Sequence, residues 1–141
     1  MFKVLIAVDG SEHANHAIEA VAWLPRGPGG LEVALVNVSN PVYYGELPAL
    51  AQEEVERARR ERQERILEEA AQRARGLGLI VGGKHGTSGS VAEEIVGLAR
   101  ETSADQIAMG TRGLGAAGSL FLGSVALGVV HRSHVPVLLV K

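Results

Sequence analysis

Short apolar runs recur five times along this chain, and they constrain its fold more than any other feature. The first run, FKVLIAV, spans residues 2–8 and is apolar at nearly every position. A strand with apolar side chains on both faces is buried on both faces, which is typical of a parallel sheet. The third run is the weakest and can extend to residue 85. The predicted strands span residues 2–8, 31–38, 79–83, 104–109 and 135–140.

Segments with helical character separate these runs. Ser11 is a favourable N-cap before the first segment, and Ser90 with Glu93 has the spacing of a capping box before the third. Trp23 is expected in the core or at its rim. Apolar residues of the second segment thicken only toward its C-terminal half, so its N-terminal half is expected to stand partly off the core. The predicted helices span residues 12–24, 49–77, 90–102 and 125–132.

The alternation of strands and helices predicts the architecture. Right-handed crossovers between parallel strands give a doubly wound α/β layer. We expect a Rossmann-like, five-stranded parallel sheet in the order 3-2-1-4-5 with helices on both faces, within a single domain over residues 1–141. Ligands of such sheets lie beyond the carboxyl ends of the strands, where the strand order reverses. Here the reversal falls between the first and fourth strands.

Composition excludes several classes of protein. The chain has no cysteine, which excludes disulfides, thiolate catalysis and cysteine-ligated zinc. A formal net charge of −2 gives no electrostatic reason to expect nucleic acid or an anionic membrane surface as a partner. No apolar run approaches the roughly 20 residues that span a bilayer, and the N-terminus lacks the features of a signal peptide. We therefore expect a cytoplasmic protein.

A glycine-rich stretch, GTRGLGAAGSLFLGS, follows the fourth predicted strand at residues 110–124. Glycines let the chain turn tightly and let a ligand touch the backbone, and exposed amide N–H groups form an anion site. Gly123 and Ser124 open a helix whose first N–H groups favour a phosphate. The stretch matches neither a Walker A loop nor the GxGxxG motif. The alternative is a surface loop that binds nothing.

Asp9 ends the first apolar run and is expected to lie at the same reversal. Its carboxylate can accept hydrogen bonds from ribose hydroxyls or from an adenine amino group. Capping the first helix is the alternative role, and the two roles can coexist. Arg112, inside the glycine-rich stretch, can reach a phosphate or lie in solvent.

At these residues the chain resembles the universal stress protein family, in its nucleotide-binding branch. The resemblance covers nearly the whole chain and includes KVLIAVDGSEHANHAI near the start, MGTRG after the fourth strand and GSVALGVVHRSHVPVLLVK at the end. The G-x2-G-x9-G-[ST] signature of that branch is matched by Gly110, Gly113, Gly123 and Ser124.

The resemblance implies an ATP-binding regulatory protein of the stress response, with Mg²⁺ beside the phosphates and a homodimer built on the last strand, Val135–Val140. An apolar strand at a sheet edge also invites pairing. Ala126 stands where ATP-binding relatives often have threonine, and Gly10 stands where some have a larger residue, which leaves the affinity open. The binding residues implied are Ala7, Val8, Asp9, Val38, Met109, Gly110, Arg112, Gly113, Gly123, Ser124 and Val125.

Two other functions remain open. The first is a slow ATPase or phosphotransferase, which needs a base or a water-orienting group. The sequence offers Arg112 and Asp9 for such chemistry but no clear base. The second is a structural dimer with no bound nucleotide, against which the intact glycine signature argues.

Histidines supply weaker candidate sites. Two pairs, His13 with His16 and His131 with His134, have a spacing that can place two imidazoles beside one metal ion. No third ligand stands beside either pair in the sequence. His85 precedes two serines, but no acid is placed to complete a catalytic triad.

Overall fold

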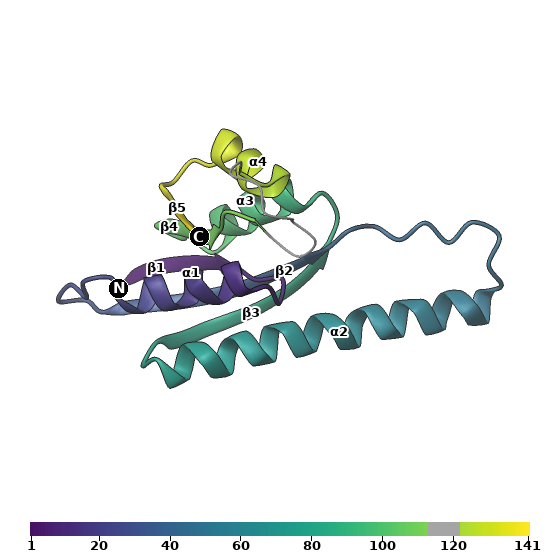
Figure 1. Cartoon of the computed structure of the whole chain (residues 1–141), viewed down its shortest axis with the longest axis horizontal. Helices are drawn as coiled ribbons and strands as arrows, with labels where there is room; N and C mark the ends of the chain where they lie inside the picture. The colour runs from purple at the N-terminus through teal and green to yellow at the C-terminus, as the bar shows by residue number, and fades with distance from the viewer. Residues whose placement is uncertain (113–121) are drawn as a thin grey trace.

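Five strands form one parallel sheet in the computed structural model, which describes residues 1–112 and 122–141. The strands are β1 (Phe2–Ala7), β2 (Leu31–Ser39), β3 (Ile80–Ser88), β4 (Gln106–Gly110) and β5 (Val137–Val140). Their order is β3-β2-β1-β4-β5, and every neighbouring pair is parallel (Figure 1). The predicted doubly wound sheet is therefore confirmed.

Helices cover both faces of the sheet. Within the described residues they are α1 (Glu12–Ala22), α2 (Ala49–Gly76), α3 (Val91–Glu101) and α4 (Ser124–Arg132). α1 and α2 pack on one face, and α3 and α4 pack on the other (Figure 1). Successive side chains of a strand point to opposite faces. Val4 and Ile6 accordingly join the first cluster and Leu5 the second, and none of the three is more than 1% exposed.

Two strands, β3 and β5, differ in length from their predictions by two residues or more. β3 runs to Ser88 although it contains several glycines, because its backbone pairs with β2 along nearly all of its length. Glycine is unusual inside strands, and this hid the second half of β3 in the sequence. β5 begins only at Val137, because Pro136 has no N–H to donate. The Pro136 carbonyl still accepts the Ile107 N–H at 3.0 Å.

Helix caps agree with the sequence in one case and differ in another. Ser11 caps α1 as predicted, since its Oγ accepts the Ala14 N–H at 3.2 Å. The prediction of a capping box before α3 is wrong. Ser90 is the N-cap there but makes no side-chain cap bond. The expectation for Trp23 is also wrong, because α1 ends at Ala22 and the Trp23 residue beyond it is 87% exposed.

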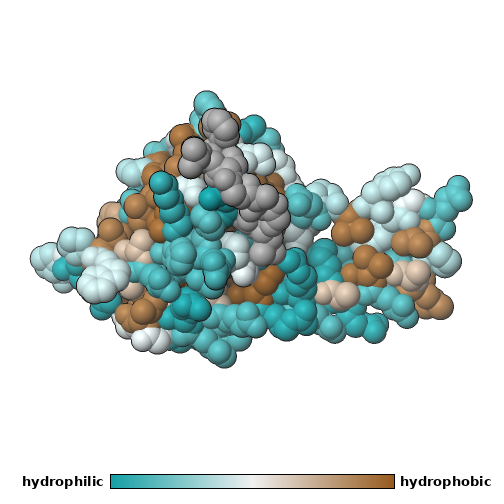
Figure 2. All heavy atoms as spheres, viewed as in Figure 1, coloured by the Kyte–Doolittle hydropathy of each residue, from teal (hydrophilic) through white to brown (hydrophobic). Residues whose placement is uncertain are grey.

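α2 docks on the sheet only through its C-terminal half, as predicted. Its buried residues are Gln63, Ile66, Leu67, Ala70, Ala71 and Ala74. The preceding part of the helix projects beyond the sheet together with the segment that joins it to β2 (Figure 1). We call residues 40–62 the arm. Exposed apolar side chains lie on it (Figure 2), namely Val42, Tyr43, Leu47, Leu50 and Val55.

Candidate functional site

β1 and β4 are neighbours in the sheet, and the chain leaves their carboxyl ends toward opposite faces. After β1 the chain enters α1 on one face, and after β4 it reaches α4 on the other. This is the reversal at which open α/β sheets bind ligands. We call residues 7–11, 37–39, 109–112 and 123–126 the switch-point region.

Asp9 holds the turn between β1 and α1. Its Oδ1 accepts the N–H of Ser11, the N-cap of α1, at 2.9 Å. Gly10, inside this turn, has a φ of +85°, which a residue with a Cβ rarely adopts. Asp9 is half-buried at the end of β1. The structure thus places it where the sequence predicted and gives it a part in starting α1.

The hydrogen-bond ladder between β1 and β2 stops just after β1. Val8 N–H donates to Val36 C=O at 2.8 Å, and the next rung of a parallel ladder would run from Val38 N–H to Val8 C=O. That rung is absent between these two described residues. The Val8 carbonyl instead accepts the Asn37 side-chain amide at 2.7 Å.

Among the described residues, the backbone N–H and C=O of Val38 consequently have no hydrogen-bond partner, and we call this pair of groups the unused backbone edge of Val38. Ser39 C=O accepts Gly89 N–H at 3.0 Å, so the peptide groups of Ser39 and Asn37 turn toward β3. Peptide groups alternate along a strand, and those of Val36 and Val38 therefore turn toward β1. Since β1 ends at Ala7, the N–H and C=O of Val38 lie side by side at the switch point.

The two ends of the glycine-rich stretch are tied together. Gly123 N–H donates to Thr111 C=O at 2.8 Å, and Thr111 N–H donates to Val140 C=O at 2.8 Å. Gly110 packs against α1 so closely that a Cβ would lie 2.6 Å from the Cβ of His13. Gly110 and Gly123 thus lie in the switch-point region as predicted. Gly113 lies outside the described residues.

Arg112 adds a positively charged side chain to the switch-point region. Its Nη1 is buried and has no hydrogen-bond partner within residues 1–112 and 122–141. α4 begins beside it, and its N-cap is Gly123, which has no side chain to pair with the first N–H groups of the helix. An unpartnered guanidinium nitrogen and a helix N-terminus both favour an anion.

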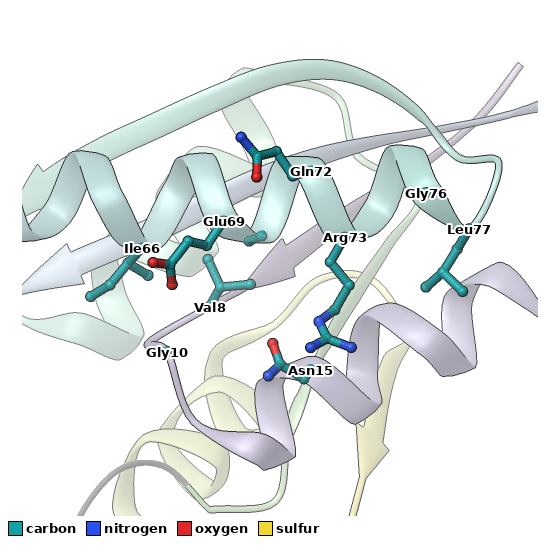
Figure 3. A pocket seen from close by; sticks show the side chains of 10 residues that line it. Val8, Gly10, Asn15, Ile66, Glu69, Gln72, Arg73, Gly76 and Leu77 are labelled. Atoms are coloured by element: carbon teal, nitrogen blue, oxygen red, sulfur yellow. The ribbon is translucent and has the colours of Figure 1, made fainter.

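Apolar residues of the predicted site divide between the two faces of the sheet. Four of them belong to or pack against the cluster of α3 and α4, namely Ala7, Val38, Met109 and Val125. Val8 belongs to the cluster of α1 and α2, and its side chain points toward α2 (Figure 3). Val8 therefore takes part in the switch point through its backbone.

Two polar residues of the region, Asn37 and Thr111, and the neighbouring Gln63 were not identified by the sequence analysis. Asn37 is detectable in principle, because it is the one amide in the apolar run LEVALVNV. Gln63 sits in a run of charged residues and Thr111 inside the glycine-rich stretch, where neither stands out. The structure brings Gln63 to Asn37 and to the Thr87 carbonyl, at 3.1 and 2.8 Å.

The histidines considered as metal ligands contact other groups in the structure. His13 Nδ1 lies 3.4 Å from Thr111 Oγ1, and His16 Nδ1 donates to Lys141 C=O at 2.8 Å. His134 follows the end of α4. Among the residues described, no group of three His, Cys, Asp or Glu side chains could hold a metal ion.

A cavity of about 560 Å³ lies between α1 and α2 (Figure 3). It shares Val8 and Gly10 with the switch-point region, and α2 adds Glu69 and Arg73 to its wall. The Arg73 guanidinium is paired with Glu19 at 3.1 Å. Because its cation is paired and Glu69 adds negative charge, this cavity suits a phosphate less well than the switch point does.

The chain matches the family model described as "Usp: Universal stress protein family" over residues 1–141. The chain belongs to the universal stress protein family. A universal stress protein of Thermus aquaticus, named from its position in the QAH/OAS sulfhydrylase 3′ region, is 42% identical over all of both chains. No helix of the described part is long and apolar enough to cross a membrane.

Solved structures show the same universal stress protein fold. The structure of hypothetical protein MJ0577 is 28% identical, with a TM-score of 0.79 over 99% of this chain and 95% of that one. A universal stress protein in complex with cAMP has 23% identity and a TM-score of 0.71, over 99% and 96% of the two chains. One from Archaeoglobus fulgidus in complex with dAMP has 23% identity and a TM-score of 0.66, over 100% and 98%.

Proposed function

We propose that this protein binds an adenine nucleotide, ATP, in the switch-point region, and that its occupancy regulates a homodimer in the stress response. One observation carries the proposal: within residues 1–112 and 122–141, an unused backbone edge at Val38 and an unpartnered guanidinium nitrogen of Arg112 occur in the same region. The first suits a base and the second a phosphate. Family members in complex with cAMP and dAMP support an adenine nucleotide as the ligand.

The Val38 edge fits adenine in particular. On the Watson–Crick edge of adenine, N1 accepts a hydrogen bond and the adjacent amino group donates one. Val38 offers the matching N–H and C=O. Guanine carries the opposite pattern and would leave both groups of Val38 unpartnered, which is the strong form of rejection for a polar site. Ala7 and Met109 would supply apolar surroundings, Val8 would border the base through its backbone, and Asp9 would accept from the ribose hydroxyls.

The phosphates would lie against the glycine-rich stretch. Arg112 would pair with them, and backbone N–H groups of Gly110, Gly113, Ser124 and Val125 would surround them. Gly123, whose own N–H is bonded to Thr111 C=O, would let them approach the backbone closely. Mg²⁺ fits this site chiefly through phosphate oxygens and water, because the described residues gather no cluster of acidic ligands. The Mg²⁺ ion would offset the phosphate charge, while Arg112 orients the chain of phosphates.

The homodimer would form through β5, the edge strand of the sheet. Val140 and Pro136 turn their carbonyls toward β4, where they accept Thr111 and Ile107 N–H groups. By alternation, the peptide groups of Val137 and Leu139 turn outward. An apolar edge with outward donors and acceptors pairs readily with a second copy of itself.

Calorimetric titration with ATP and Mg²⁺ tests the proposed function. The parent is expected to bind with micromolar affinity, and Gly123→Val is expected to lose binding, because even a Cβ would lie 3.3 Å from Thr111 C=O. Arg112→Gln should weaken the binding of ATP but not of adenosine. Gly97→Ala is the control, since a Cβ there meets nothing within 4 Å.

Thermal unfolding of each variant would show that it is folded before its binding is compared. A folded parent that binds no adenine nucleotide would refute the proposal. Equal losses for ATP and adenosine in Arg112→Gln would remove the phosphate role of Arg112.

A further inference from the structure

Asn37 and Gln63 are buried amides whose arrangement calls for an explanation. They are 6% and 7% exposed, and the only other buried polar residue in the described part is Ser11, the cap of α1. Burying an amide is unfavourable unless its donors and acceptors are paired. Asn37 comes from β2 and Gln63 from the point where α2 reaches the sheet.

Backbone carbonyls fix the orientation of Gln63. Its terminal nitrogen lies 3.0 Å from Asn37 C=O and 2.8 Å from Thr87 C=O. A carbonyl accepts only, so the group facing both must be the NH₂ of Gln63. Gly86 makes room for this side chain, because a Cβ on Gly86 would lie 2.6 Å from Gln63 Oε1.

Gln63 in turn fixes the orientation of Asn37. The NH₂ of Gln63 also lies 3.1 Å from a terminal atom of the Asn37 side chain, which must therefore be the acceptor Oδ1. Only Nδ2 then remains to face Val8, and it donates to the Val8 carbonyl at 2.7 Å. The result is one directed chain of hydrogen bonds from α2 through β2 to the end of β1.

We propose that Asn37 and Gln63 are positioning residues that select adenine, because they hold the Val8 carbonyl and so leave the N–H and C=O of Val38 open for the base. This proposal rests on the proposed function. Neither residue needs to touch the nucleotide. Were the Asn37 amide lost or reversed, the Val8 carbonyl would be free to accept Val38 N–H and extend the β1–β2 ladder across the edge that reads the base.

Two measurements on the full chain test the proposal. The first is the affinity for ATP and for GTP of the parent, Asn37→Leu and Gln63→Leu. The parent should prefer ATP, and both variants should lose about tenfold of that preference, the effect of one hydrogen bond. Val21→Ala is the control, because it opens a cavity in the core at a buried position of α1 and removes none of the hydrogen bonds given above for the two amides.

The second measurement is hydrogen exchange at individual amides of the ligand-free protein. In the parent, Val38 N–H should exchange much faster than Val8 N–H, which is bonded to Val36 C=O. In Asn37→Leu, Val38 N–H should become protected. This readout does not depend on nucleotide binding.

The outcomes separate the two proposals. If the parent binds no nucleotide, the proposed function fails, and the exchange of Val38 alone then decides whether the amide pair holds the edge open. A Val38 amide already protected in the parent overturns the inference. An ATP preference that stays intact in Gln63→Leu also overturns it. The same holds if Val21→Ala, at matched thermal stability, loses as much of the ATP preference as the two amide variants do.

Discussion

Gly110 is needed at the switch point because a side chain would not fit there, rather than because glycine makes the backbone flexible. The Cα of Gly110 faces the first turn of α1, with the Cβ and the carbonyl carbon of His13 2.6 and 2.9 Å from where a Cβ would stand. Two elements from opposite ends of the chain can meet there only because the side chain is absent. The close packing of the end of β4 against the start of α1 therefore requires a glycine at position 110.

Gly110→Ala should destabilise the protein by about 1–3 kcal/mol, because α1 must move to admit the methyl group. Denaturant unfolding measures this loss. Gly97→Ala provides the comparison inside α3, where a Cβ meets nothing within 4 Å and should raise stability by about 0.5–1 kcal/mol. If Gly110→Ala proved as harmless as Gly97→Ala, α1 would not be packed on β4 as described.

Among the elements, α2 is one continuous helix whose two halves are held in different ways. Its docked half contributes buried side chains, whereas its N-terminal half is held by a small network in the arm. There Tyr44 Oη donates to Glu56 at 2.8 Å, and Arg59 Nε donates to the same carboxylate at 3.0 Å. These bonds tie the segment after β2 to the helix that follows it.

The arm network should respond to acid. The Arg59 guanidinium, with help from the Tyr44 hydroxyl, lowers the pKa of Glu56 to about 2 from its ordinary 4.5. A carboxyl whose pKa is lowered on folding stabilises the fold above its ordinary pKa, and this contribution is lost as the pH falls from about 4.5 through about 2. The NMR signal of the Glu56 carboxyl carbon should titrate accordingly.

Matched arginine variants assign the cause. Arg59→Met should raise the pKa of Glu56 substantially, whereas Arg57→Met should leave it near its parent value, because no hydrogen bond or ion pair between Arg57 and Glu56 occurs in the described part of the chain. Equal shifts in both variants would contradict the assigned network and point to the general charge of the helix.

At the scale of the whole molecule, β5 supplies the surface on which a second copy would assemble. Leu139→Pro should abolish the homodimer, because it removes an N–H that turns outward, away from β4. Leu139→Ala is the matched control, since it shortens the same side chain but keeps the N–H. Sedimentation at micromolar concentration should show a monomer for the first variant and a dimer for the second. A dimer in both would place the interface elsewhere.

The sequence predicts the fold well because each strand carries its own signal. FKVLIAV reads as a buried strand without knowledge of its neighbours, and Ser11 marks the start of α1 locally. Errors cluster where the local signal misleads, as with the glycines of β3 and the capping box at Ser90. The pairing with β2 decides the outcome for β3, whereas Ser90 takes the predicted N-cap position without making the side-chain bond of a capping box.

The switch-point region is predictable only in part. Gly110 and Gly123 stand out as residues, and the strand order places them at the reversal. The open edge of Val38 does not stand out, because it depends on a bond missing between two strands. The Asn37–Gln63 pair joins residues 26 apart in sequence through hydrogen bonds. No periodicity or motif encodes such a contact, which exists only once α2 has docked on the sheet.

The arm leaves the sheet and returns to the place where it began. Ser39 Oγ, at the end of β2, lies 3.1 Å from Gln63 Nε2, where α2 docks, so the two ends of residues 40–62 meet at a closed base. Segments of this kind accept insertions and deletions, since changes in their length do not move the ends. Changes in the length of the arm can therefore accumulate during evolution while the strands beneath it keep their register.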